Sequence, residues 1–463
     1  MQYDTQFPQL TMALQPLRMK ELLQKVLLTP LDPRKQALLL DACVIGEKRY
    51  KPGKSCVLSY RLHLHDTRTG AKYEQVVSAR LCRLDEGPAE FQRARSQHLV
   101  HTPGLQALAY LPEAEMIVWS FPNDRKLSHL PKLLDVEFLK PHLSAQLRTL
   151  SIGESHEITA ITPKVLHYLP ERSCMIRYDL SLQHRSTKAC NAVTLYGKTF
   201  RDESGAEVYS IMQQLAKQLS RNATPLGYDR ELRTMWQSHV PGLPFLWETL
   251  PASRMPTMMR AVARCVAEFH RCTVHTNRRF DPNNLDESLM ETITTAEQAY
   301  PNYASRIAAL VDVLLTERQS MAWSESLSTP VHRDLKMGNF LIQGEHVTLI
   351  DMDDVCLGDP HTDLGSLIAN FHLNGIRAGW GTDRVHESME VFVRAYTEHV
   401  PWNVPRPQVD WYTAAAFINE ITRRSIRQLD SERVKHIGQY LNLCESVLST
   451  RSGQSDARRS GKL

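Results

Sequence analysis

The stretch Val331-His-Arg-Asp-Leu-Lys-Met-Gly-Asn-Phe340 is the most informative part of the 463-residue chain. After an apolar start it places a carboxylate, Asp334, and five residues later a side-chain amide, Asn339. A carboxylate in a loop held by a preceding strand can orient a hydroxyl group and accept its proton. An amide supplies a neutral oxygen to a hard cation such as Mg²⁺. The spacing therefore predicts a loop that combines proton transfer with metal binding.

A second carboxylate cluster follows in Val347-Thr-Leu-Ile-Asp-Met-Asp-Asp354, an apolar strand pattern that ends at Asp351. An apparent hairpin over residues 340–350 joins the two motifs. We expect Asp351 and Asn339 to be the protein ligands of a metal ion, because Mg²⁺ that bridges phosphates leaves room for one or two. Asp353 is either a further ligand or a group that supports the ligands.

Each motif alone is also typical of a turn with a capping carboxylate. Together they match the order His-x-Asp-x-x-x-x-Asn followed by a metal-binding Asp, which is typical of phosphoryl transfer by enzymes of the protein-kinase type. His332, Asp334 and Asn339 take these places, and Asp351 comes twelve residues after Asn339. The sequence therefore predicts a phosphotransferase.

Residues 331–364 resemble the aminoglycoside phosphotransferase family through Ile350-Asp-Met-Asp353 and Gly358-Asp-Pro-His-Thr-Asp-Leu364. The resemblance implies an α+β, bilobal protein-kinase-like fold with a small antiparallel-sheet N-lobe and a mostly helical C-lobe. It also implies that Asp363 is a structural carboxylate that steadies the catalytic loop. The chain departs from the family pattern at Arg333 and Lys336, which are protein-kinase-like choices. We expect Lys336 to act near the transferred phosphate, with a solvated loop lysine as the alternative.

An internal repeat precedes this region, because two segments align without a gap over about forty residues at a shift of 118 positions. Each copy has the alternating pattern of a small antiparallel sheet, so a duplicated N-lobe-like sheet domain is expected ahead of the kinase-like lobes. The matched pairs are Tyr50 with Tyr168, Pro52 with Pro170, Ser55 with Ser173, Cys56 with Cys174, Tyr60 with Tyr178, Leu62 with Leu180, and Gly87 with Gly205.

The second copy carries Lys198, the candidate for holding the α and β phosphates of the nucleotide. Glu207, in the helical pattern that follows, is its expected partner, and Glu203 is the rival. The first copy has Arg80 in place of Lys198, and a guanidinium differs from an ammonium group in reach and geometry. No Gly-rich phosphate loop is present, so the hydroxyl of Ser173 is a candidate phosphate contact, with an ordinary turn residue as the alternative.

These patterns predict four parts. Residues 1–150 form a degenerate duplicate of the N-lobe with an N-terminal helical segment, 151–240 the nucleotide-binding N-lobe, 241–449 the catalytic and substrate-binding C-lobe, and 450–463 a disordered tail. Two short strands around a turn at Gly227-Tyr-Asp229 are expected to lead into the breaker cluster Val240-Pro-Gly-Leu-Pro244.

Composition and charge pattern argue against a disordered, membrane-bound, nucleic-acid-binding or disulfide-rich protein. Hydrophobic residues make up 42% and charged residues 23%, as in ordinary folded proteins. The chain has no long apolar run and no apolar leader, so no membrane partner and a cytoplasmic location are expected. Its basic residues come singly, which argues against nucleic acid. Nine scattered cysteines favour reduced thiols.

The predicted reaction is transfer of the γ-phosphoryl group of ATP, with GTP as the alternative donor, to a hydroxyl of a small molecule. Asp334 is the expected base, and Mg²⁺ is the expected cofactor. Residues 241–450 hold 26 Asp+Glu against 19 Lys+Arg. This excess suits an aminosugar, sugar or amino alcohol as acceptor, although a solvated surface explains it too. The alternatives are a nucleotide-binding regulatory pseudokinase module and a protein kinase.

Overall fold

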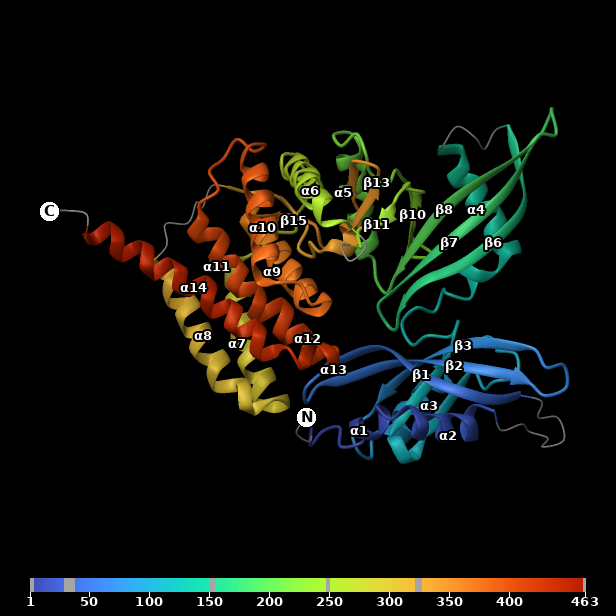
Figure 1. Ribbon diagram of the computed structural model, residues 1–463. Coiled ribbons are helices and arrows are strands. Elements are labelled where there is room, and N and C mark those ends of the chain that lie inside the picture. Colours follow the sequence, from blue (N-terminus) through green and yellow to red (C-terminus); the bar gives the residue numbers. More distant parts are fainter. Residues whose placement is uncertain (1–3, 29–37, 150–154, 247–249, 321–326, 461–463) are drawn as a thin grey trace. The chain divides into compact units, whose positions relative to one another are not determined.

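The computed structural model describes residues 4–28, 38–149, 155–246, 250–320 and 327–460, and Figure 1 labels their helices and strands. The chain divides into two compact units. The first unit comprises Met1–Ala206, Leu226–Ser238 and Arg427–Leu429. The second comprises Glu207–Pro225, His239–Ile426 and Asp430–Leu463.

The first unit contains two five-stranded antiparallel sheets of the same strand order, β1-β2-β3-β5-β4 and β6-β7-β8-β10-β9. The elements of the first copy are α1 (Leu10–Ala13), α2 (Pro16–Leu27), β1 (Leu38–Lys51), β2 (Ser55–Asp66), β3 (Lys72–Leu81), α3 (Gly87–Arg95), β4 (Leu108–Leu111) and β5 (Met116–Ser120). Those of the second copy are α4 (Val136–Thr149), β6 (His156–Leu169), β7 (Ser173–His184), β8 (Cys190–Phe200), α5 (Ser204–Ala216), β9 (Pro225–Asp229) and β10 (Thr234–Ser238).

The 118-residue shift seen in the sequence extends to the last strand of each sheet. Strands β2 and β7 begin 118 residues apart, at Ser55 and Ser173, and β5 and β10 do so at Met116 and Thr234. A register irregularity follows Leu40 in β1 and its counterpart Ile158 in β6. The predicted duplication of the sheet domain is therefore confirmed.

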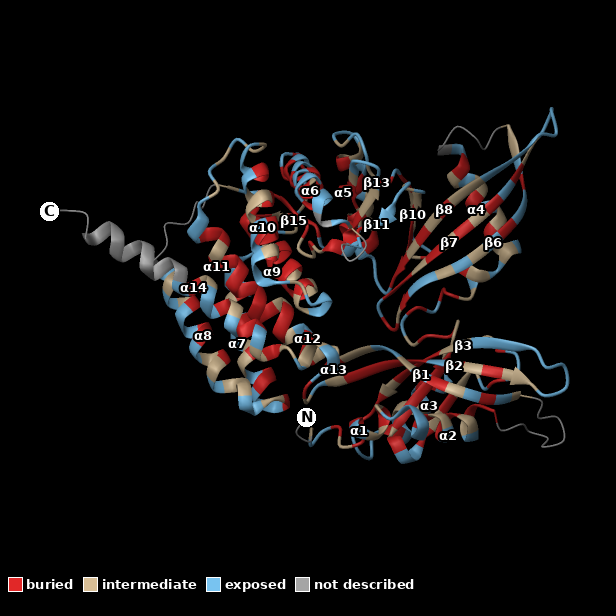
Figure 2. Cartoon of the chain, viewed as in Figure 1, coloured by how far each residue is buried: buried red, intermediate tan, exposed pale blue. Residues whose placement is uncertain are grey.

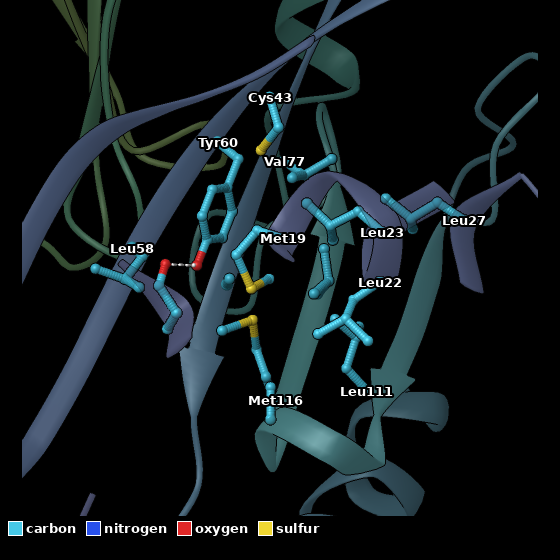
Figure 3. Close-up of a cluster of buried hydrophobic side chains, with 14 of the residues drawn as sticks. Met19, Leu22, Leu23, Leu27, Cys43, Leu58, Tyr60, Val77, Leu111 and Met116 are labelled. Carbon is cyan, nitrogen blue, oxygen red and sulfur yellow. Dashed lines mark hydrogen bonds between the residues drawn. The ribbon is translucent and has the colours of Figure 1, made fainter. Parts of the chain in front are cut away.

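Each sheet buries one face against its own helix, because apolar residues alternate along the strands. In the first copy α2 packs on β1, and its Met19 and Leu23 belong to a core that includes Leu58 and Val77 (Figures 2 and 3). In the same core, Figure 3 shows the buried ring of Tyr60, whose hydroxyl donates to the carbonyl of Ala13 at 2.8 Å.

Equivalent polar contacts recur in the second copy. Tyr178, the counterpart of Tyr60, donates its hydroxyl to the carbonyl of Leu133 at 2.9 Å. Gly87 and Gly205 also have equivalent neighbours, since an added Cβ would meet Tyr110 at the first and Tyr228 at the second within 3 Å. The matched glycines are thus explained by close packing against a tyrosine ring.

The turn between the first two strands is anchored in the same way in both copies. In the first, Asp4 accepts from the hydroxyl of Tyr50 at 2.6 Å and the N–H of Gly53 at 2.9 Å. In the second, Asp124 accepts from Tyr168 at 2.5 Å and the N–H of Glu171 at 3.0 Å. Gly53 and Glu171 both have positive φ, 64° and 58°. An aspartate therefore fixes this turn in each copy, and in the second copy the turn precedes Ser173, the residue predicted to contact phosphate.

Glu171 differs from Gly53 in adding a buried carboxylate to that turn. Its oxygens accept from Arg125 at 2.7 and 3.0 Å, and Arg80 of the first sheet approaches at 3.4 Å. The Glu171 side chain is 5% exposed, and both arginines are 28% exposed. Burial would raise the pKa of Glu171, but the arginines outweigh it and hold the pKa below its ordinary value. Arg80 thus joins the first sheet to the turn of the second.

Replacing Glu171 by glutamine should destabilise the first unit by about 2–3 kcal/mol, because two half-buried arginines lose a charged partner. The measurement is the urea midpoint followed by tryptophan fluorescence. The control is Glu231→Gln, whose exposed pair with Lys132 is screened by water and should hardly move the midpoint. Equal midpoints for the two variants would refute a role for Glu171 in holding the turn.

One sequence expectation is wrong. Gly227-Tyr-Asp229 do not form a turn but lie within β9, and the connection to β10 runs through Arg230–Arg233. Gly and Asp favour turns by their local conformations, yet pairing within the five-stranded sheet prevails here. Arg233 takes the left-handed conformation, with φ 46°.

The second unit is mostly helical. Its helices after α5 are α6 (Met255–His270), α7 (Pro282–Ala299), α8 (Pro301–Ser320), α9 (His361–Ala378), α10 (Thr382–Thr397), α11 (Arg406–Ala416), α12 (Arg423–Arg427), α13 (Ser431–Val434) and α14 (Ile437–Ser460), with a π-helical turn η8 (Phe417–Thr422). Its strands are β11 (Leu243–Pro244), β12 (Thr329–Val331), β13 (Phe340–Gln343), β14 (His346–Leu349) and β15 (Cys356–Gly358).

The predicted α+β fold class, with antiparallel sheets ahead of a mostly helical part, is confirmed. The hairpin expected over residues 340–350 is β13 paired with β14. The four-part division stays a prediction, although a unit boundary falls between Ser238 and His239. The backbone of α14 enters the range assigned to the tail and continues to Ser460, and residues 461–463 lie outside the described part.

Candidate active site

The predicted catalytic loop leaves β12 and is held by the buried carboxylate of Asp363, at the start of α9. Asp363 accepts the backbone N–H groups of His332 at 2.5 Å and Arg333 at 2.9 Å. His270 of α6 lies 3.1 Å from the same carboxylate, and both side chains are 0% exposed. Arg333 has φ 66°, a conformation that costs a non-glycine residue energy. The structural role inferred for Asp363 is confirmed.

Two hydrogen bonds tie this loop to the segment that follows β14. The ring Nε2 of His332 donates to the carbonyl of Ile350 at 2.9 Å, and the N–H of Ile350 donates to the carbonyl of Asn339 at 2.9 Å. Ile350, the residue before Asp351, is therefore hydrogen-bonded directly to Asn339. The structure thus brings the two predicted metal ligands close together.

Asp334 lies between two cations. Lys336 donates to its Oδ2, and Arg424 of α12 lies 3.1 Å from its Oδ1. Burial alone would raise the pKa of Asp334, but Lys336 and Arg424 together hold it below its ordinary value. An ionised carboxylate is the form that accepts a proton, so this charge environment suits a base.

The side chain of Asn339 is oriented by the same loop. Its Nδ2 donates to the backbone carbonyl of Asp334 at 2.9 Å, which leaves Oδ1 as the end that can bind a cation. Asp351 follows β14 in the left-handed conformation, with φ 69°, and is exposed. An amide oxygen and a carboxylate are ligands that Mg²⁺ prefers.

These residues fit a metal ion shared with a nucleotide rather than an ion held by protein alone. Within the described ranges, no three His, Cys, Asp or Glu side chains are grouped to hold a metal. Mg²⁺ typically takes one or two carboxylates and completes its shell with phosphates and water, which matches Asn339 and Asp351. The role of Asp353 stays a prediction.

Arg278 connects the helix α5 with the segment after Asp351. Its Nε donates to Glu207 at 2.7 Å, and its Nη1 donates to the carbonyl of Asp353 at 2.6 Å. Thr276 donates to the other oxygen of Glu207 at 2.6 Å. Burial would raise the pKa of Glu207, but these partners hold it low. Sequence reasoning missed Arg278, because no local pattern marks a contact between residues so far apart in the chain.

The nucleotide-binding candidates of the first unit lie on β7 and β8. Lys198 occupies β8, with its Nζ 5.9 Å from the ring centroid of Phe200. Ser173 is the buried first residue of β7. Glu203, the rival partner, accepts from Tyr228 at 3.2 Å. Because Lys198 and Glu207 belong to different units, their pairing stays a prediction, as does the phosphate contact of Ser173.

In the part of the chain that the structure describes, we find no helix with the length and apolar character required to cross a bilayer.

Residues 195–407 match the model of the phosphotransferase enzyme family. The comparison with curated proteins gives no match. Similar solved structures include an amicoumacin kinase in complex with AMP-PNP, Ca²⁺ and Ami (13% identity, 66% of this chain and 96% of that chain, TM-score 0.45). Another is spectinomycin phosphotransferase in complex with ADP and spectinomycin (13% identity, 68% of this chain and 98% of that chain, TM-score 0.43). A third is choline kinase from Cryptosporidium parvum (10% identity, 68% of this chain and 97% of that chain, TM-score 0.48).

The matched range contains the loop with Asp334 and Asn339, the strand end at Asp351 and the buried Asp363. Residues 195–407 are therefore similar in sequence to the phosphotransferase enzyme family, which agrees with the family resemblance and with the enzyme class predicted from the motifs.

Proposed function

We propose that the protein is an ATP- and Mg²⁺-dependent phosphotransferase that acts on a hydroxyl group of a small molecule. The strongest support comes from two hydrogen bonds. Asn339 donates to the carbonyl of Asp334, and Ile350, the residue before Asp351, donates to the carbonyl of Asn339. These hydrogen bonds support a base and two oxygen ligands within one loop and hairpin.

In the proposed reaction the acceptor oxygen attacks the γ phosphorus of ATP, and its proton passes to Asp334. The bond from the γ phosphorus to the β–γ bridging oxygen breaks, and ADP leaves with the electron pair. Asn339 and Asp351 would hold the Mg²⁺, with Asp353 as a further ligand or support. The ion neutralises charge on the phosphates when bound. Lys336 offsets charge on the transferred group.

The first unit is proposed to supply the remaining contacts to the nucleotide. Lys198 would bind the α and β phosphates, with Glu207 as its partner, and Ser173 would contact phosphate from the turn that Asp124 anchors. The proposed roles of Asn339 and Asp351 in metal binding can be tested separately from catalysis.

Replacing Asn339 by alanine or Asp351 by asparagine should weaken binding of Mg²⁺·AMP-PNP about 10- to 100-fold, since each contact to a charged group contributes about 1.5–3 kcal/mol. Calorimetric titration with and without EDTA measures this directly. Glu345→Gln, an exposed carboxylate in the β13–β14 turn, is the matched control. If Asn339→Ala and Asp351→Asn both bind Mg²⁺·AMP-PNP as tightly as wild type, these residues are not the metal ligands.

The pH dependence tests the role of Asp334. Lys336 lowers the pKa of Asp334 while burial raises it, so Lys336→Met should raise the pKa of this carboxyl. Asp334 is then ionised only at higher pH, and the acidic limb of kcat/KM should move upward in pH. The measurement is a kcat/KM profile through the acidic range for both proteins. A lower rate with an unmoved limb would mean that Lys336 does not act through Asp334.

A further inference from the structure

Arg80 and Lys198 occupy the same place in the two sheets of the first unit. Each lies in the third strand of its sheet and pairs with a residue of the second strand and a residue of the fifth. These partners are again 118 residues apart: Val57 and Ile117 beside Arg80, and Met175 and Met235 beside Lys198. The equivalence inferred from the repeat therefore holds in the hydrogen-bonded register of the strands.

Both side chains leave their sheet on the face away from its helical core. Ala79 and Leu81, which flank Arg80 in β3, belong to the core of the first copy. Because successive side chains of a strand alternate between faces, Arg80 points to the opposite face. Leu195 belongs to the core of the second copy and lies three positions before Lys198, so Lys198 also faces away from its core. The proposed nucleotide-binding face of the second sheet thus has a direct counterpart in the first.

The turn of the second copy contacts this counterpart face. Arg80 donates to an oxygen of Glu171 at 3.4 Å. Ser78, two residues earlier on the same face of β3, is a hydrogen-bond partner of the Tyr168 hydroxyl. Arg125, in the segment that joins the copies, donates to both oxygens of Glu171, at 2.7 and 3.0 Å. A carboxylate of the chain itself therefore meets the arginine that stands in the place of the nucleotide-binding lysine.

The two copies show that the turn does not need this carboxylate for its conformation. Gly53 and Glu171 are matched by the repeat, and both have positive φ. An aspartate side chain accepts the backbone N–H at each position. A non-glycine residue in this conformation costs energy that glycine does not. What Glu171 adds is therefore the link from the turn to Arg80 and Arg125.

We propose, on the basis of the proposed function, that Arg80, Arg125 and Glu171 are positioning residues, which hold the turn before Ser173 in place to meet the phosphates of the nucleotide. A carboxylate bound by both arms of a guanidinium is fixed in orientation as well as in distance. Ser173 follows Glu171 by two residues, so the link restrains its hydroxyl. The first copy is then a scaffold for the second and binds no nucleotide of its own, because Glu171 engages Arg80.

The test compares a ligand that has phosphates with one that has none. Calorimetry with the full chain measures affinities for Mg²⁺·AMP-PNP and for adenosine, and wild type should bind one nucleotide per chain. Glu171→Gly, which copies Gly53, and Glu171→Gln, which keeps the Cβ, should each weaken Mg²⁺·AMP-PNP about 3- to 10-fold, the weight of about one hydrogen bond. The affinity for adenosine should not change. Circular dichroism verifies that each variant is folded.

Variants of opposite charge separate positioning from direct electrostatics. Arg80→Gln should also weaken Mg²⁺·AMP-PNP, and Arg80→Lys should restore part of the loss. A direct charge effect on the phosphates would have opposite signs, because loss of Glu171 would then tighten binding. Arg80→Gln combined with Glu171→Gln should cost less than the sum of the two, since both act through one contact. The control is Glu47→Gln, which removes another carboxylate between the two sheets, 3.7 Å from His167, and should leave both affinities unchanged.

Three results would each overturn the inference: equal losses for adenosine and Mg²⁺·AMP-PNP, unchanged or tighter Mg²⁺·AMP-PNP binding in the Glu171 variants, or two nucleotides per wild-type chain. A wild-type chain with no affinity for nucleotide would overturn the inference and the proposed function together. Failure of the proposed function alone is recognised separately, because the selective loss of Mg²⁺·AMP-PNP affinity would then occur in a protein that transfers no phosphate to any small-molecule hydroxyl.

Discussion

Replacing Asp334 by asparagine should lower the rate of phosphoryl transfer roughly 10²–10⁴-fold, the range that a positioned general base contributes. Asparagine keeps the shape of the side chain but cannot accept the proton of the attacking hydroxyl. Nucleotide binding should survive, because the proposed ligands of Mg²⁺ are Asn339 and Asp351. Rates from coupled ADP release and affinities for Mg²⁺·AMP-PNP together measure the two expectations.

The matched control for this variant is Glu345→Gln, which removes a carboxylate from the same hairpin region at an exposed position. Wild-type turnover in Asp334→Asn would exclude this carboxylate as the base. Loss of nucleotide binding together with turnover would assign Asp334 to the nucleotide site instead.

Replacing Asp363 by alanine should destabilise the second unit by about 3–5 kcal/mol, because each buried donor left without its acceptor costs about 1–3 kcal/mol. Asp363 is fully buried and accepts the N–H groups of His332 and Arg333 while it faces His270. Its loss leaves these donors without an acceptor and releases the left-handed backbone of Arg333. Thermal unfolding and turnover at a low temperature provide the measurement.

Asp383→Asn, at an exposed position in the first turn of α10, provides the control for stability. If Asp363→Ala melts within the error of this control, the carboxylate does not hold the loop. If it is destabilised but keeps full turnover at low temperature, the loop is positioned by other contacts, such as the bond from His332 to Ile350.

The parts of the site that could be predicted from the sequence are those whose spacing is local. Asp334, Asn339 and Asp351 lie within one loop and hairpin, so the chain itself fixes their order and approximate separation. The duplicated sheet was predictable for a related reason, since matched residues such as Tyr60 and Tyr178 take equivalent places in the two cores.

The parts that could not be predicted depend on tertiary packing. The contacts of Arg424 with Asp334, Arg278 with Glu207 and Glu171 with Arg80 span 71–91 residues of chain, and no periodic pattern encodes such contacts. The charges around Asp334 could not be predicted for the same reason, because net charge summed over a lobe does not say which side chains surround this carboxylate. The turn expected at Gly227–Asp229 failed because sheet pairing overrode local turn preference.

Phosphorus NMR of the wild-type protein with Mg²⁺·ATP and a panel of sugars, aminosugars and amino alcohols tests the central claim most directly. The account predicts a phosphate monoester signal that grows in step with ADP and is absent in Asp334→Asn. Release of inorganic phosphate alone, or bound nucleotide that is never consumed with any acceptor, would contradict it.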